Sequence, residues 1–95
     1  MIAVHPGRIL KRELAAREMS ANKLAIALRL PSGRITDILN GKRGVSPETA
    51  LRLGRCFGNS ARFWLNLQTS YELAVAEKEI GQRIVDEVAP ADAAA

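Results

Sequence analysis

Apolar residues recur at helical spacing along most of the chain, and no stretch shows the strict alternation typical of a strand. The pattern predicts helices over about residues 7–18, 21–28, 32–40, 47–57 and 60–79. It continues more weakly through Ile84 and Val88, and residues 89–95 show no pattern and are expected to form a flexible tail. The predicted fold class is therefore all-α, in a single domain spanning residues 1–95.

Two of the predicted helices are short and lie on either side of a tight turn, between residues 20 and 41. Ser20 can cap the first helix, because its hydroxyl can accept a hydrogen bond from a backbone N–H of the first turn. Pro31 then interrupts the pattern, since proline has no N–H to donate and disfavours helical geometry in the residue before it. Ser32 can cap the second helix, and Gly41 suits the left-handed position that follows many helices. This layout is that of a helix-turn-helix.

The second helix of this pair turns Ile35, Ile38 and Leu39 inward and leaves an outer face of short polar residues. That face consists of Ser32, Gly33, Arg34, Thr36, Asp37 and Asn40. Short hydrogen-bonding groups and a glycine let a helix approach the edge of a base pair closely, which suits the major groove of DNA. The alternative is that these are ordinary capping and surface residues. The cations Lys42 and Arg43, which follow directly, favour the DNA interpretation because they can contact phosphates.

Ser46, Pro47 and Glu48 form a strong helix start, with a cap residue, a proline at the first position and an acidic residue in the first turn. The helix that they begin is expected to have a structural role and to bury Ala50, Leu51, Leu53 and either Gly54 or Phe57.

The last helix, which Ser60 can cap, carries apolar residues on more than one side. One side holds Phe63, Trp64, Leu67, Tyr71, Ala74 and Val75. This apolar surface exceeds what a monomer of this size needs to close its core. We expect part of the cluster to seal the core and the remainder to form a dimer or partner interface.

Charge is divided unevenly along the chain. Residues 1–62 carry three Lys and nine Arg against four acidic residues, a net charge of +8, whereas residues 63–95 have a net charge of −4. A basic first two-thirds suits a polyanion, because neutralising phosphates releases counterions and supplies most of the non-specific affinity for DNA. The acidic third is expected to face a different partner.

The sequence carries no arrangement that indicates catalysis, a metal site or a cofactor. Cys56 is the single cysteine and His5 the single histidine, so neither a disulfide within the chain nor a zinc cluster is expected. We expect Cys56 to pack as a small apolar residue and His5 to lie at the surface or cap a helix. No apolar run could span a bilayer, and residues 1–10 lack the features of a secretory signal, which predicts a cytoplasmic, nucleoid-associated protein.

Over roughly residues 4–80 the chain resembles the HigA-type antitoxins of bacterial toxin–antitoxin operons, within the phage-repressor-like (Xre/Cro) group. The resemblance is carried by the segments HPGRILKRELAARE and LNGKRGVSPETALRLGRCFGNSARFWLNLQTSYEL and by the helix-turn-helix between them. It implies a five-helix repressor-type fold with an extended C-terminal helix. It also implies a homodimer that binds a palindromic operator in its own promoter, and a partner toxin of the HigB kind, an mRNA-cleaving nuclease acting at the ribosome.

By position, the resemblance also implies two sets of DNA-contacting residues. The base-reading residues would be Ser32, Gly33, Arg34 and Thr36. The phosphate-binding residues would be Ser20, Asn22, Lys23, Asn40, Lys42 and Arg43. The sequence has Ala21 and Asn22 where the commonest repressors have a glutamine, and it places the anion Asp37 near DNA, where it can pair with Arg34 or Arg43.

The leading hypothesis is a DNA-binding antitoxin that represses its own operon and neutralises a basic, HigB-like toxin. One alternative is an interaction module that chiefly captures the toxin, which the acidic charge after Phe63 favours. Another is a stand-alone phage-type repressor without a toxin partner. An enzyme is not expected.

Overall fold

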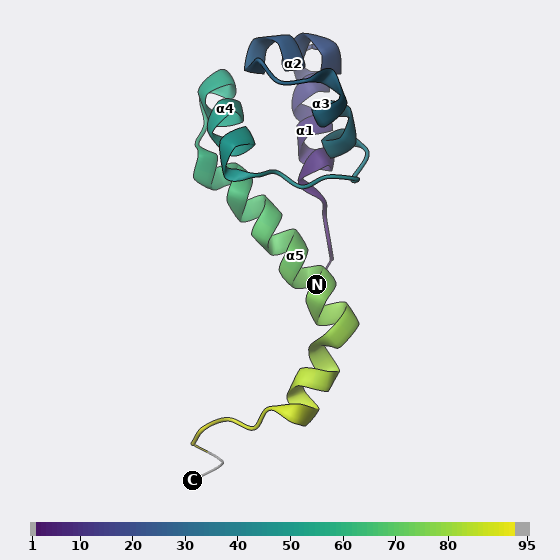
Figure 1. Ribbon diagram of the computed structural model, residues 1–95, viewed down its shortest axis with the longest axis vertical. Helices are drawn as coiled ribbons and strands as arrows, with labels where there is room; N and C mark the ends of the chain where they lie inside the picture. The colour runs from purple at the N-terminus through teal and green to yellow at the C-terminus, as the bar shows by residue number, and fades with distance from the viewer. Residues whose placement is uncertain (1, 93–95) are drawn as a thin grey trace.

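The computed structural model describes residues 2–92, and this part of the chain contains five α-helices joined by loops (Figure 1). They are α1 (Pro6–Ala16), α2 (Ala21–Leu28), α3 (Ser32–Leu39), α4 (Pro47–Phe57) and α5 (Ala61–Glu87). No strand occurs among the described residues. The predicted all-α class is confirmed, and the bounds of α2 and α4 agree with the predicted ranges.

Side-chain caps start four of these helices. The Oγ atoms of Ser20, Ser46 and Ser60 each accept a hydrogen bond from the backbone N–H three residues later. His5 caps α1 through Nδ1, which accepts from the N–H of Gly7 at 2.9 Å. These bonds satisfy N–H groups that have no partner within their own helix, and they confirm the predicted caps.

The start of α3 differs from the prediction. Ser32 is the first helical residue, and Pro31, with φ −59° and ψ 140°, takes the cap position without a side-chain bond. The ring of Pro31 already fixes φ at a value that the extended backbone of a cap residue can adopt. Its carbonyl oxygen accepts a bond from the N–H of Arg34 at 3.1 Å, so the first turn forms without a serine hydroxyl.

One apolar core joins α1–α4 to the first turn of α5. Its residues, each less than a tenth exposed, are Leu10, Leu14, Leu24, Ala25, Leu28, Leu30, Ile35, Ile38, Val45, Ala50, Leu53 and Trp64. Trp64 is the largest of them, and its indole Nε1 donates to Oδ1 of Asn59 at 2.9 Å, so burial leaves this donor paired. The prediction that Leu51 is buried is wrong, because Ala50 and Leu53 occupy the inward face of α4 and Leu51 is 65% exposed.

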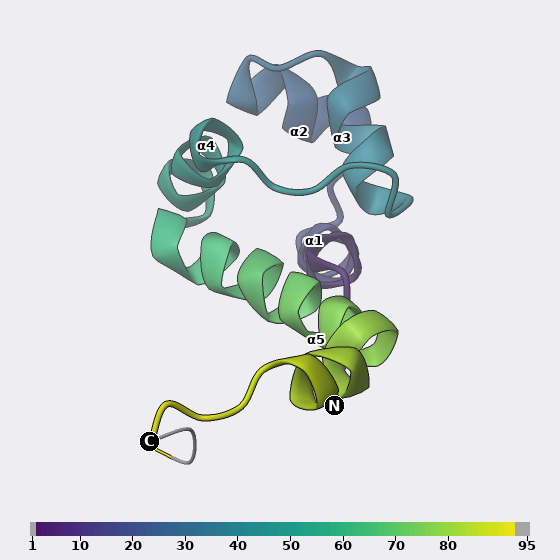
Figure 2. The same ribbon diagram turned by 60° about the horizontal axis from the view of Figure 1, so that its bottom comes forward.

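Glycines allow two close approaches between helices. A Cβ on Gly7 would lie 1.9 Å from the carbonyl oxygen of Ile38, so the start of α1 lies directly against the end of α3. A Cβ on Gly54 would lie 2.9 Å from the backbone N of Ala61, at the corner where α4 gives way to α5. Helix α1 packs against α5 as well as α3, and so it sets the position of these two helices relative to each other (Figure 2).

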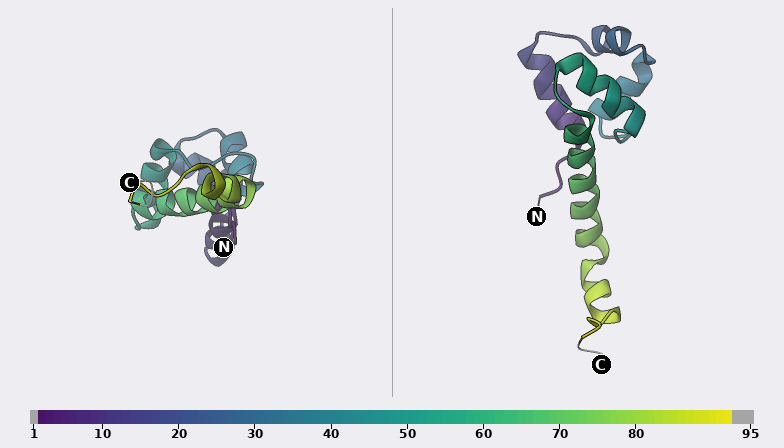
Figure 3. Two further views of the ribbon diagram at one scale, coloured as in Figure 1. Left: turned by 90° about the horizontal axis from the view of Figure 1, so that it is seen from below. Right: turned by 90° about the vertical axis from the view of Figure 1, so that its left-hand side faces the viewer.

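Helix α5 is longer than predicted and projects from the body formed by α1–α4. It runs without interruption to Glu87, eight residues beyond the predicted end at residue 79. The side view in Figure 3 shows the body at one end of a rod, and the overall dimensions are 56 × 22 × 21 Å. Of the predicted tail, residues 89–92 are non-helical and exposed, and residues 93–95 lie outside the described residues.

Candidate nucleic-acid interface

The outer face of α3 is uncovered. Its exposed residues, which lie outward as predicted, are Ser32, Gly33, Thr36 and Asn40. Ile35 and Ile38, on the opposite side, have no exposed surface, so the helix is anchored through its apolar side. Apart from the adjacent residues and the backbone of α3 itself, no atom of residues 2–92 lies within 4 Å of the place where a Cβ on Gly33 would stand. A helix held in this way can enter a groove without rearrangement of the body.

Thr36 has a hydroxyl whose proton is already engaged. Its Oγ1 donates to the carbonyl oxygen of Ser32, one turn earlier, at 3.1 Å. The outward side of Thr36 therefore presents lone pairs and a methyl group. Such a side chain can accept a hydrogen bond from the exocyclic amine of adenine or cytosine, or contact the methyl group of thymine.

Arg34 lies half-buried at the edge of α3 that faces α4. Its Nη1 is 3.5 Å from Oε1 of Glu48, in the first turn of α4. The predicted pairing of Asp37 with Arg34 or Arg43 is wrong: Arg34 extends across to α4, and Asp37 makes no ion pair within residues 2–92. A long ion pair with a mostly exposed carboxylate contributes about 1 kcal/mol or less, so Arg34 can leave Glu48 for another acceptor at little cost.

The loop after α3 holds its backbone fixed and its cations exposed. The N–H groups of Lys42 and Arg43 both donate to the carbonyl oxygen of Asp37, at 2.8 and 3.3 Å. Gly41, with a φ of 75°, makes the left-handed turn that this arrangement requires, as predicted. The side chains of Lys42 and Arg43 extend into solvent. Both cations can therefore contact phosphates from a rigid base.

Gln68 of α5 supports the same loop, a role that no local sequence pattern indicates. Its Oε1 accepts from the N–H of Val45 at 2.8 Å, and its Nε2 donates to Glu72 at 3.0 Å. A Cβ on Gly44 would lie 2.7 Å from Nε2 of Gln68, so the loop passes directly against α5. The two residues joined by this bond are 23 positions apart, which places their contact beyond the reach of helical periodicity.

His5 joins the N-terminal segment to two other parts of the chain, which are helix α5 and the loop that follows α3. Its ring lies edge-on to Tyr71, with the centroids 4.9 Å apart, and it also lies beside Gly41 and the backbone of Arg43. Burial lowers the pKa of His5 from its ordinary value of 6.5, although the Arg43 backbone favours the protonated ring. The cap of α1 needs a lone pair on Nδ1 to accept from Gly7, and a neutral ring can supply it.

The predicted phosphate-binding residues of α2 lie in its first turn and at its cap. Ser20, Asn22 and Lys23 are all exposed. The Oγ of Ser20 accepts from the N–H of Lys23 at 3.0 Å, which leaves the hydroxyl proton available as a donor. This turn can therefore present a hydroxyl, an amide and an ammonium group to an anion.

The apolar residues predicted along one side of α5 do not share one environment. Trp64 and Ala74 are 1% and 4% exposed, so the chain itself covers them and they offer no surface to a partner. Leu67 packs against the core, and Tyr71 and Val75 are half-buried. Phe63 is 42% exposed and meets Trp64 edge-on, with the ring centroids 5.2 Å apart.

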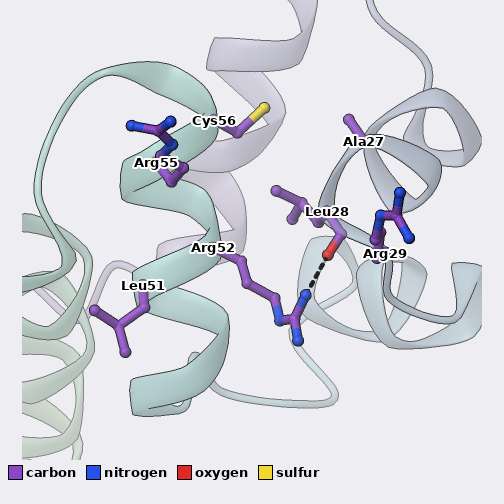
Figure 4. A pocket seen from close by; sticks show the side chains of 7 residues that line it. All are labelled: Ala27, Leu28, Arg29, Leu51, Arg52, Arg55 and Cys56. Carbon is purple, nitrogen blue, oxygen red and sulfur yellow. Dashed lines mark hydrogen bonds between the residues drawn. The ribbon is translucent and has the colours of Figure 1, made fainter.

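A shallow groove of about 320 Å³ separates α2 from α4 (Figure 4). It is lined by Ala27, Leu28, Arg29, Leu51, Arg52, Arg55 and Cys56. Nη1 of Arg52 donates to the carbonyl oxygen of Leu28 at 2.9 Å and so joins α4 to the end of α2. The prediction that Cys56 packs as an apolar residue is wrong, because Cys56 lies exposed at this groove, away from the inward face of α4.

The described part of the chain contains no group of three or more His, Cys, Asp or Glu residues placed to hold a metal ion. Within residues 2–92, none of the helices combines the length and the apolar character that crossing a bilayer requires.

The chain is similar to known proteins along most of its length, although no protein-family model matches it. Virulence-associated protein I of Dichelobacter nodosus is 48% identical over 80 residues, which make up 83% of this chain and 74% of that protein. An addiction module antidote protein of the HigA family from Coxiella burnetii is 48% identical, with a TM-score of 0.92, and the match covers 95% of this chain and 99% of that one. The chain belongs to the HigA family of antitoxins.

A second HigA structure shows the same architecture. It is the antitoxin HigA of Pseudomonas aeruginosa with the higBA promoter, which is 42% identical, with a TM-score of 0.92, over 95% of this chain and 99% of that one. The predicted HigA resemblance is therefore confirmed, together with the five-helix repressor-type fold and the extended C-terminal helix.

Proposed function

We propose that this HigA-family chain is a DNA-binding antitoxin that represses transcription of its own operon. The observation that carries the proposal is the open outer face of α3, anchored by Ile35 and Ile38 and followed directly by the exposed cations Lys42 and Arg43. The Pseudomonas aeruginosa relative, whose structure contains the higBA promoter, supports duplex DNA as the partner.

Within this proposal, the start of α3 reads the bases. The residues that carry this role are Ser32, Gly33, Arg34 and Thr36. Gly33 admits a base edge closely because it has no side chain and the space where a Cβ would stand is open, and Thr36 offers acceptor lone pairs and a methyl group. Arg34 exchanges its contact with Glu48 for the O6 and N7 atoms of a guanine, which a guanidinium can bind with two hydrogen bonds.

A second set of residues contacts phosphates and positions the protein on the duplex. It consists of Ser20, Asn22, Lys23, Asn40, Lys42 and Arg43. These residues lie in the first turn of α2 and in the loop after α3, and all six are exposed. Phosphate contacts carry no sequence information, so this set determines affinity and salt dependence rather than the choice of operator.

Anisotropy titrations with the chain's own upstream DNA, over a series of salt concentrations, separate the two roles. Arg34→Ala is expected to lose about 1–3 kcal/mol of discrimination between the operator and a scrambled duplex, because it removes a base contact. Lys42→Ala is expected to weaken both duplexes alike and to lower the slope of log affinity against log salt by about one.

Arg83→Ala is the matched control, because it removes one cation from the far end of α5, where Glu87 of the same helix is its only ion-pair partner within residues 2–92. We expect it to leave operator affinity and the salt slope nearly unchanged. If the purified chain ignored its upstream DNA at low salt, or if Arg83→Ala weakened binding as much as Lys42→Ala, the proposed interface would be wrong.

We also propose that the chain acts as a homodimer on a palindromic operator and that it binds and neutralises a HigB-like, mRNA-cleaving toxin. A two-fold dimer matches the symmetry of a palindrome. The net charge of −4 over residues 63–95, most of which form the projecting α5, complements a basic toxin. The membership of the HigA family supports the same partner.

Capture of the protein encoded beside this gene tests the toxin proposal. A variant with Arg34, Lys42 and Arg43 all replaced by alanine is expected to lose operator binding and still retain the toxin in a pull-down. Loss of capture in this variant would contradict separate surfaces for DNA and toxin. A chain that represses its promoter but binds no neighbouring gene product would instead be a stand-alone repressor.

A further inference from the structure

Asp37 lies on the outer face of α3, on the side that would meet DNA. It stands one turn after Gly33 and one turn before Asn40, so the three residues follow one another along the same side of the helix. Asp37 itself is half-buried, whereas Gly33 and Asn40 are exposed. Because α3 lies at the edge of the body (Figure 2), this side of the helix is open to a ligand.

The carboxylate of Asp37 is not used within the fold. Among residues 2–92 it forms no ion pair and accepts no hydrogen bond. Arg34, one turn earlier in the same helix, extends to Glu48 of α4 instead. The carboxylate oxygens therefore keep their lone pairs for a donor outside the described chain.

The backbone of Asp37 has a structural role that its side chain does not share. The carbonyl oxygen of Asp37 accepts bonds from the N–H groups of Lys42 and Arg43, at 2.8 and 3.3 Å. Every residue type supplies this carbonyl group, so the turn after α3 does not require an acidic side chain. The contacts of the fold thus give no reason for a carboxylate at this position.

An acidic side chain on a surface that meets DNA has an electrostatic cost. Phosphates repel it, and so it lowers the general affinity for any duplex. The exposed cations Lys42 and Arg43, in the loop that follows, keep the local net charge positive, so α3 can still approach. The cost of the carboxylate is offset only where it meets a hydrogen-bond donor on a base.

The major groove offers few donors of this kind. A carboxylate can only accept, and the donors that base pairs present there are the exocyclic amines of cytosine and adenine. In adenine the amine lies beside N7, whose lone pair repels the second carboxylate oxygen. In cytosine the amine lies beside a C–H group, which does not repel it. Guanine and thymine present acceptors, so cytosine is the base that a carboxylate selects.

We propose that Asp37 reads one cytosine in each half of the operator and disfavours the other three bases at that position. This inference rests on the proposed DNA-binding function with its palindromic operator, and it adds a specificity-determining residue to the base-reading set. Gly33 makes the contact possible, because the absence of a side chain one turn earlier lets the short Asp37 side chain reach a base edge. Asp37 thereby contributes to the choice of operator while it weakens binding to all other DNA.

Duplexes altered one base pair at a time test this assignment. Footprinting first locates the site in the upstream DNA, and each pair is then replaced, together with its symmetry mate, by the other three pairs. We expect one C·G pair whose replacement weakens binding of the native chain by roughly tenfold. Asp37→Ala is expected to bind all versions of that position within about twofold of one another. It is also expected to bind a scrambled duplex at least as tightly as the native chain, because it removes a charge that phosphates repel.

Asp37→Asn gives a sharper result, because an asparagine side chain both accepts and donates. It can bond to N6 and N7 of adenine together. We therefore expect the preferred base to change from cytosine to adenine at the same position and at no other, an exchange that a merely structural role would not produce. Asp86→Asn, the same substitution at an exposed position near the end of α5, is the matched control and is expected to keep the native preference throughout.

The outcomes separate this assignment from the DNA proposal itself. Retention of the cytosine preference by either Asp37 variant would overturn the assignment, and so would an Asp37→Asn variant that does not turn to adenine. An equal loss of affinity for every duplex, with reduced helical content by circular dichroism, would show a structural role instead. If Lys42→Ala weakened binding while both Asp37 variants kept the native preferences, the DNA proposal would stand and only this one would fail. A native chain that binds no duplex at low salt would refute both.

Discussion

At the scale of single residues, three of the side chains proposed to contact DNA also have a role within the fold. Ser20 caps α2, Thr36 bonds to its own helix and Arg34 pairs with Glu48, and each keeps groups available for a ligand. The cap at Ser20 could be predicted, because capping depends on neighbours a few residues away. The contact between Arg34 and Glu48 could not, since a loop of unknown path separates the two residues.

His5 is expected to make the stability of the fold depend on pH. Burial lowers the pKa of His5 in the folded chain below its ordinary value of 6.5. At a pH between the folded-state pKa and the unfolded-state pKa, the unfolded chain therefore binds a proton more readily than the folded chain does. The free energy of unfolding is therefore expected to stay level above about pH 7.5 and to fall as the pH drops through 6.5 toward the lowered pKa. Denaturant titrations between about pH 5 and pH 8 measure this fall.

His5→Asn provides the control for that measurement, because an asparagine side chain can cap α1 without titrating. The variant is expected to lose the part of the pH dependence that lies in this window. A variant with the same slope as the native chain would show that another group is responsible.

At the scale of secondary-structure elements, the sequence located every helix, and the main differences concern the cap of α3 and the end of α5. The cap of α3 is not the predicted Ser32, because Pro31 can take the cap position without a side-chain bond. The end of α5 was displaced because Gly81 weakens the apolar pattern. A single glycine costs a helix only about 1 kcal/mol, and no proline follows until Pro90, so the helix continues to Glu87.

Two glycine-to-alanine substitutions are expected to change the free energy of unfolding in opposite directions. Gly7→Ala is expected to lower the free energy of unfolding by about 3 kcal/mol or more, because the new methyl group collides with the Ile38 carbonyl oxygen. Gly33→Ala is expected to change it by less than about 1 kcal/mol, in the stabilising direction, since the site is open and alanine favours a helix.

The same pair also tests the interface, because the methyl group of Gly33→Ala stands on the outer face of α3. Denaturant unfolding measures the stability difference, and operator titration of the well-folded Gly33→Ala variant measures the contact. We expect weaker operator binding by this variant. Native affinity would show that DNA does not approach α3 at Gly33.

At the scale of the whole molecule, the division of charge in the sequence corresponds to a division in space. The residues of α1–α4 lie within the segment that has a net charge of +8, and the projecting part of α5 lies within the acidic segment. The charge division was readable from the residues themselves, whereas the extended C-terminal helix was expected only from the family resemblance. An apolar pattern shows which residues avoid water, but not whether the same chain or another one covers them.

A chain that ends at Glu79 is expected to keep the body folded and to bind its operator more weakly. Every residue of the core lies before this point, so the free energy of unfolding of the body is expected to change by less than about 1 kcal/mol. Operator affinity is expected to fall, because the shortened chain loses Ile80, Ile84 and Val88 from the apolar surface of α5 that is available to the proposed homodimer. Chemical denaturation and gel-shift titration measure the two effects, and undiminished operator binding would contradict a need for the projecting helix.

The bond from Gln68 to the backbone of Val45 joins two uncharged groups. Dissolved ions screen the attraction between charges, but they leave a neutral hydrogen bond almost unaltered. We therefore expect the segment that carries Lys42 and Arg43 to keep the same conformation at high and at low ionic strength. Any decline in DNA affinity on adding electrolyte then reflects a smaller free-energy gain from releasing the cations that surround the nucleic acid, and not a change in the protein.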